Sequence, residues 1–153
     1  TIKALNAKLG TETLAEAVLA GTPGAEMLLC SRMGVPVTTR IDSYGFRNPL
    51  PETAAPVDLM ILGDSFAEGI CLDDGQHFVD QMRAGGASIL NTASRGAGPL
   101  YELAVLGRYG PHFRPRITVL AFFEGNDWEN LSVETEQPWL HEALAPEADF
   151  GPI

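Results

Sequence analysis

Three polar loops in this 153-residue sequence carry residues that together could perform acyl transfer, and each loop follows an apolar run. Ser65, after the first run, offers a hydroxyl nucleophile, and its backbone N–H can donate to a developing oxyanion. Gly96, in the second loop, has no Cβ, so backbone N–H groups can approach a reacting carbonyl closely. Asn126, in the third loop, has a neutral amide donor. The three loops therefore predict a nucleophile with an oxyanion hole.

Each of these residues also has a purely structural interpretation. Ser65 could cap a helix, Gly96 could be a turn glycine ahead of Pro99, and Asn126 could begin an Asx-turn. Their order after three successive apolar runs is what favours the catalytic interpretation.

The apolar runs themselves predict a parallel sheet. The runs 59–62, 88–91 and 117–123 begin 29 residues apart, a spacing typical of βαβ units. Helices are expected between them, over 78–84 and 100–109. The predicted fold class is therefore α/β. In open α/β sheets, ligands bind beyond the carboxyl ends of the strands, which is where the three loops lie.

We expect the rest of the sequence to frame this core. A lead-in segment covers 1–56, the βαβαβ core covers 57–131, and an acidic segment covers 132–153, as a loop or the start of a missing remainder. Within the lead-in segment, the pattern predicts a helix over 11–21 and a short edge strand over 35–40.

Loops over 43–49 and 51–56 are expected to connect the lead-in segment to the core. A sheet of only three strands leaves an apolar edge unpaired, so we expect the chain to be a fragment or to lack segments. The sequence begins at Thr1 rather than Met, which indicates a trimmed N-terminus.

Composition excludes several function classes. The formal net charge of −10 argues against a nucleic-acid groove or an anionic membrane surface. Residues 117–153 hold eight acids and no Lys or Arg, which we interpret as a solvated face or a loose tail. No apolar run reaches the roughly 18 to 20 residues of a membrane-spanning helix. No metal cluster or nucleotide motif appears, so no cofactor is expected.

The two cysteines, Cys30 and Cys71, have no CxxC spacing and therefore indicate neither a zinc site nor a dithiol redox motif. We expect two buried or incidental thiols, with a disulfide as the open alternative.

The chain resembles the SGNH (GDSL) hydrolase family over roughly residues 40–131. The segments 61–69, 91–99 and 124–127 are similar to its first three sequence blocks, and 42–48 is similar to a segment that precedes the nucleophile strand in one bacterial branch. The resemblance implies a flavodoxin-like three-layer α/β/α fold. It also implies an activity on ester bonds and, by family, a secreted or periplasmic location.

The resemblance assigns roles residue by residue. Ser65 would be the nucleophile, and its N–H, the Gly96 N–H and the Asn126 amide would form the oxyanion hole. The family's C-terminal Asp-x-x-His block, which supplies the base, has no counterpart after Asn126. The Asp74 to His77 segment has the right spacing, but it opens the first helix and is interpreted as a chance match.

The other two histidines are also poor candidates for the base. His112 is expected in the loop entering the third strand, at the opposite edge of the sheet from the site. His141 is expected on the surface beside Glu142.

Several functions follow from these expectations. The leading one is a serine esterase or deacetylase acting on a small-molecule or carbohydrate ester. An O-acetyltransferase is its close variant. A non-catalytic module that binds a carbohydrate or a partner protein through Trp128 and Trp139 belongs to a different class. A phosphate-binding flavodoxin-like domain is disfavoured, because Asp64 and Glu68 would repel phosphate and no P-loop pattern is present.

Overall fold

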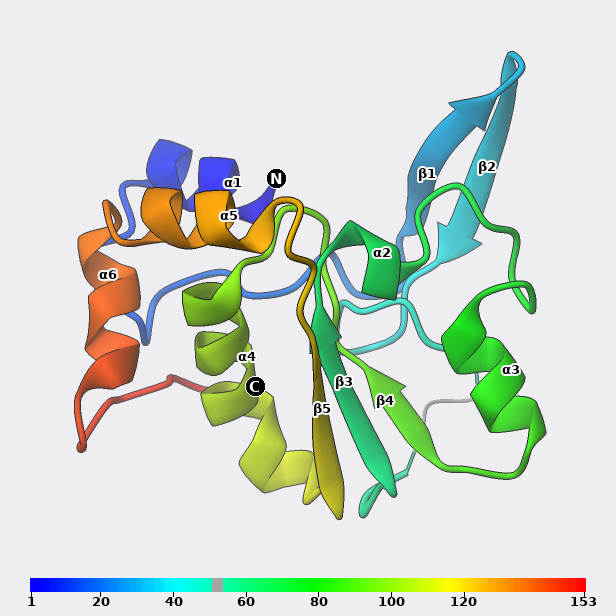
Figure 1. Cartoon of the computed structure of the whole chain (residues 1–153). Helices are drawn as coiled ribbons and strands as arrows, with labels where there is room; N and C mark the ends of the chain where they lie inside the picture. The colour runs from blue at the N-terminus through cyan, green and yellow to red at the C-terminus, as the bar shows by residue number, and fades with distance from the viewer. Residues whose placement is uncertain (51–53) are drawn as a thin grey trace.

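The computed structural model describes residues 1–50 and 54–153, so part of the loop expected over 51–56 lies outside the described residues. It contains a three-stranded parallel sheet flanked by helices, together with a separate antiparallel hairpin (Figure 1). The parallel sheet has the strand order β4-β3-β5. The expected α/β class and the parallel sheet are confirmed.

The central strand β3 (Leu59–Gly63) forms because its side chains are apolar on both faces. Met60, Ile61 and Leu62 are all buried. The strand pairs in parallel with β4 (Ile89–Asn91) on one edge and with β5 (Ile117–Ala121) on the other. Continuous apolar runs of this kind are typical of parallel strands that helices cover on both sides.

The two helices expected between these strands are present. One is α3 (Phe78–Ala84), and the other is α4 (Pro99–Phe113), which is longer than predicted. α4 extends because Tyr101, Val105, Tyr109 and Phe113, four residues apart, form one continuous buried face. Pro99 occupies its first turn, where a missing N–H costs nothing.

The predicted helix over 11–21 is wrong. The N-terminal helix is instead α1 (Ile2–Leu9), which the Thr1 hydroxyl caps. Leu14 is still buried, as the sequence suggested, but in an irregular segment. Its carbonyl accepts a hydrogen bond from the Arg108 guanidinium at 2.6 Å, and Val18 pairs with the Asn6 side chain. These tertiary hydrogen bonds replace the ones that a helix would have made.

The hairpin consists of β1 (Glu26–Arg32) and β2 (Val35–Arg40) and projects away from the sheet in Figure 1. The strand expected over 35–40 is confirmed, whereas β1 was not predicted. A disulfide joins Cys30 of β1 to Cys71, so the expectation of two free thiols is wrong. A disulfide is consistent with an extracytoplasmic location.

The acidic C-terminal part contains more structure than the expected loop. α5 (Asp127–Glu134), α6 (Pro138–His141) and the 3-10 helix η1 (Glu142–Leu144) follow β5. Trp139 and Leu140 lie in the same buried cluster as residues of α4 and of the lead-in segment. In α5 the buried residues are the acids Asp127 and Glu134, whereas α6 and η1 bury Trp139, Leu140 and Ala143. Within the described ranges, no helix is long and apolar enough to cross a membrane.

Candidate functional site

Ser65 lies where β3 turns sharply into the short helix α2 (Ser65–Glu68). The turn needs Gly63, whose φ is +157° and whose missing Cβ would stand 2.6 Å from the Cβ of Ala67. Asp64 caps α2, because its carboxylate accepts the N–H of Phe66 at 2.9 Å. Ser65 is partly exposed, and no hydrogen bond among the described residues uses its hydroxyl.

Asn126 is held beside this turn by a buried carboxylate. Its Nδ2 donates to Oδ2 of Asp64 at 3.0 Å, and Asp64 directly precedes Ser65. Asp64 is fully buried, and each of its carboxylate oxygens accepts one hydrogen bond, Oδ1 from Phe66 and Oδ2 from Asn126. Because a carboxylate only accepts, this contact sets the orientation of the Asn126 amide. The amide has a second N–H, which none of the described hydrogen bonds occupies.

Gly96 lies in the loop after β4, at the same edge of the sheet. Ser94 in that loop donates its N–H to the Gly63 carbonyl at 3.0 Å, which ties the second loop to the first. Gly96 has φ +77°, and a Cβ there would stand 3.1 Å from the Thr1 side chain. The structure thus brings Asn126 to the turn that contains Ser65, and it places Gly96 in the neighbouring loop, beside Thr1.

Sequence reasoning did not identify Asp64 as the group that orients Asn126. A local signal was available, because an aspartate directly before a short helix is a common N-cap. No local pattern indicated that Asp64 also accepts a hydrogen bond from Asn126, which is 62 residues away in the sequence.

None of the three histidines contacts Ser65. His112 lies in the last turn of α4 rather than in a loop, and its Nε2 is 3.1 Å from the hydroxyl of Tyr44. His141 lies on α6, where its Nε2 is 2.7 Å from the carbonyl oxygen of Thr135.

His77 packs against Gly69, the residue that ends α2. Its ring is buried there and is not paired with Ser65. Burial and then the charge of Arg47 lower the pKa of His77, which keeps the ring neutral. Its Nε2 has no hydrogen-bond partner among the described residues. We interpreted the Asp74 to His77 spacing as a chance match, and this interpretation stays a prediction.

A layer of buried carboxyl groups lies behind the site. Glu134 caps α4 by accepting the N–H groups of Gly98, Leu100 and Tyr101, and it forms a salt bridge with Lys3 at 2.9 Å. Sequence analysis assigned this residue only to a solvated acidic face, which the structure corrects.

Glu102 and Asp127 complete this buried layer. Neither carboxyl oxygen of Glu102 has a hydrogen-bond partner in the described part of the chain. Burial, and then the charges of Asp127, Glu134 and Asp64, raise the pKa of Glu102 to about 8. Burial also raises the pKa of Asp127. Glu102 is consequently mostly protonated at neutral pH.

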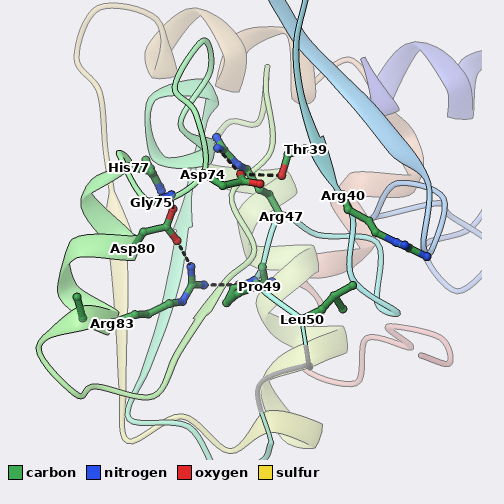
Figure 2. Close-up of a pocket in the computed structure, with 12 residues that line it drawn as sticks. Thr39, Arg40, Arg47, Pro49, Leu50, Asp74, Gly75, His77, Asp80 and Arg83 are labelled. Atoms are coloured by element: carbon green, nitrogen blue, oxygen red, sulfur yellow. Dashed lines mark hydrogen bonds and ion pairs between the residues drawn. The ribbon is translucent and has the colours of Figure 1, made fainter.

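A cavity of about 620 Å³ lies away from Ser65, between the base of the hairpin and α3 (Figure 2). Three arginines line it, Arg40, Arg47 and Arg83, and the donors of Arg47 and Arg83 are already used. Arg47 binds Asp74 and the carbonyls of Glu68, Gly69 and Leu72, and Arg83 binds Asp80, Asn48 and the Ile89 carbonyl. In Figure 2, Asp74 sits between Thr39 and Arg47. Arg47 and Arg83 are therefore paired within the lining, whereas the Arg40 guanidinium and Nε2 of His77 have no partner among the described residues.

No group of three His, Cys, Asp or Glu side chains in the described part of the chain could hold a metal ion. Comparison of the chain with protein-family models, with curated proteins and with solved structures gave no match.

Proposed function

We propose that this protein is a serine ester hydrolase of the SGNH type, with Ser65 as its nucleophile. The observation that carries the proposal is the Asp64–Asn126 hydrogen bond, which holds a neutral amide donor beside the turn that presents Ser65. The neighbouring loop with Gly96 reaches the same end of the sheet. A secreted or periplasmic location is part of the proposal, supported by the disulfide.

The proposed reaction uses each residue in a defined role. The Ser65 hydroxyl attacks the ester carbonyl, and its proton passes to a base as the C–O bond forms. The oxyanion receives hydrogen bonds from the N–H groups of Ser65 and Gly96 and from the free amide N–H of Asn126. The alcohol then leaves with a proton, and water hydrolyses the acyl-enzyme. In the O-acetyltransferase variant, a sugar hydroxyl takes the place of water.

The base is the missing element of this proposal. The hydroxyl of Ser65 contacts none of the three histidines, and a serine without a base is a weak nucleophile. We propose that the base is a histidine outside residues 1–153. Imidazole added to the solution should replace it in part, since a small base can reach a partly exposed hydroxyl.

The test is covalent labelling by a fluorophosphonate, read by intact mass and peptide mapping, with and without imidazole. We expect one adduct on Ser65 that forms faster with imidazole, and no adduct in the Ser65→Ala variant. Asn126→Ala should slow labelling by about 100-fold, the usual cost of one lost oxyanion donor. Labelling that is equally fast in Ser65→Ala would contradict the proposal.

A non-catalytic binding module is the second candidate, favoured by the same lack of a base. Trp128 is 65% exposed and lies two residues after Asn126. Its ring packs edge-on against Phe122, with the ring centroids 5.1 Å apart, and the exposed indole could receive a sugar ring. Trp139 is buried and serves only the core, which removes it from the predicted binding residues. Quenching of Trp128 fluorescence by an acetylated oligosaccharide, with no Ser65 adduct under any condition, would favour this candidate.

A further inference from the structure

Arg95 connects three segments of the chain at the proposed site. It precedes Gly96 in the loop after β4, and its Nε donates to Oε2 of Glu68 at 2.9 Å. Its Nη1 donates to the carbonyls of Leu28 and Leu29 in β1, at 3.2 and 3.3 Å. Glu68 is buried in α2, so its carboxylate requires a charged partner, which Arg95 supplies. Arg95 therefore joins the loop of Gly96 to α2 and to the hairpin.

Arg95 and Gly96 occupy the two central positions of a tight turn. The Ala97 N–H donates to the Ser94 carbonyl at 2.9 Å, and the φ of Gly96 is +77°, as in a type II turn. In a type I turn the peptide between the two central residues is reversed, so that its N–H points the other way. Glycine adopts both signs of φ at little cost. A contact outside the turn therefore has to fix the direction of the Gly96 N–H.

Two backbone donors beside this turn are unused. Among the described residues, neither the Gly96 N–H nor the Ser65 N–H donates a hydrogen bond. An oxyanion hole needs its donors about 3 Å from one oxygen, so both N–H groups must point to the same place. A reversed peptide between Arg95 and Gly96 would remove one donor. The ion pair of Arg95 with Glu68 acts at this point, because it fixes the turn relative to the helix that begins at Ser65.

The disulfide closes a ring of contacts around the turn. Arg95 binds the carbonyl of Leu29, and the next residue of β1 is Cys30. The disulfide partner of Cys30 is Cys71, which lies three residues after Glu68. The register between β1 and β2 shifts at this point, and such bulges commonly redirect groups beside active sites. The strand that anchors Arg95 is therefore bonded covalently to the segment that follows α2.

We propose that Arg95 is a positioning residue that directs the Gly96 N–H toward the oxyanion, and that the disulfide supports it by holding β1. The inference rests on the proposed ester hydrolase function. It identifies the hairpin as the part of the fold that controls the second oxyanion donor. Removing any contact of the ring should therefore slow the attack by Ser65 without changing the nucleophile itself.

The rate at which the fluorophosphonate labels Ser65, with imidazole present, tests this role. Arg95→Met should lower the maximal labelling rate about tenfold, less than the loss of a whole oxyanion donor. The reagent concentration that gives half of the maximal rate should stay unchanged, because the donor acts only in the transition state. Arg95→Lys, which can still pair with Glu68, should recover part of the rate. The control Arg116→Met, at the opposite end of the sheet, should label at the wild-type rate.

Combined variants separate one shared role from independent damage. Serine at both Cys30 and Cys71, or Glu68→Gln alone, should slow labelling but add nothing to Arg95→Met, because the contacts of the ring act as one unit. The amide signal of Gly96 in a ¹⁵N NMR spectrum should also move in Glu68→Gln. Circular dichroism ensures that only folded variants are compared.

The outcomes distinguish this inference from the function on which it rests. Labelling of Ser65 that Arg95→Met leaves unchanged would overturn the inference and leave the proposed function standing. No Ser65 adduct in the wild type would overturn the proposed function, and the inference with it. Losses that multiply in the combined variants would overturn the positioning role. A Gly96 signal that Glu68→Gln does not move would overturn it as well, whatever the labelling rates.

Discussion

Replacing Glu102 by glutamine should change how the stability of this protein depends on pH. The residue is only 2% exposed, and neither carboxyl oxygen has a hydrogen-bond partner within residues 1–50 and 54–153. Burial, with the charges of Asp127, Glu134 and Asp64, raises its pKa from 4.5 to about 8. Between these two values, the folded chain holds a proton that the unfolded chain has released. Stability must therefore fall as the pH rises through this window.

The magnitude follows from the width of that window. Each pH unit changes the free energy of unfolding by about 1.4 kcal/mol, so about 4 kcal/mol is lost between pH 5 and pH 8. Glutamine has the shape of the protonated acid and does not ionise. Glu102→Gln should therefore match the wild type near pH 5 and exceed it by about 4 kcal/mol at pH 8.

Urea unfolding at pH 5, 6, 7 and 8, followed by the fluorescence of the buried Trp139, measures this difference. The matched control is Glu129→Gln, which makes the same change on an exposed residue of α5 and should shift neither curve. Parallel pH curves for Glu102→Gln and the wild type would refute the reasoning, because they would mean that Glu102 is ionised in the folded chain.

Two further predictions concern the contacts that hold the site in place. Serine at both Cys30 and Cys71 should lower the free energy of unfolding by about 3 to 4 kcal/mol, because the disulfide closes a loop of 41 residues. Glu134→Ala should cost at least about 3 kcal/mol, because it leaves the buried N–H groups at the start of α4 without an acceptor and Lys3 without its partner. Urea unfolding at pH 7 measures both changes.

The controls for these two predictions are equally direct. Glu136→Ala, two residues from Glu134 but exposed, should change the free energy of unfolding by less than about 0.5 kcal/mol. A reducing agent should destabilise the wild type and have no effect on the double serine variant. Equal stability of wild type and double variant would show that the disulfide does not constrain the unfolded chain.

The parallel core could be predicted because its signals are local. Leu59 to Leu62 is apolar on both faces, and the repeat of strands and helices is regular. The position of Ser65 at the end of β3 follows from the same pattern. The N-terminal helix could not be predicted correctly, because the helical spacing around Leu14 competes with hydrogen bonds from Arg108, 94 residues away.

The partners of the site residues depend on contacts that no local pattern encodes. Asp64 and Asn126 are 62 residues apart, and Glu134 reaches the start of α4 from a helix that the acidic composition assigned to solvent. The Cys30–Cys71 bond belongs to the same group, since its 41-residue spacing matches no motif.

The sequence by itself determined the α/β class, the approximate positions of the three parallel strands and the loops at the carboxyl edge of their sheet, because hydrophobic periodicity acts over a few neighbouring residues. It missed β1, and it placed the end of the third parallel strand at 123 rather than at Ala121. Only the tertiary structure decided which carboxylate orients Asn126 and which acids are buried. These features depend on desolvation and on hydrogen bonds between distant segments. Both effects arise only when the chain has folded and the segments are in contact.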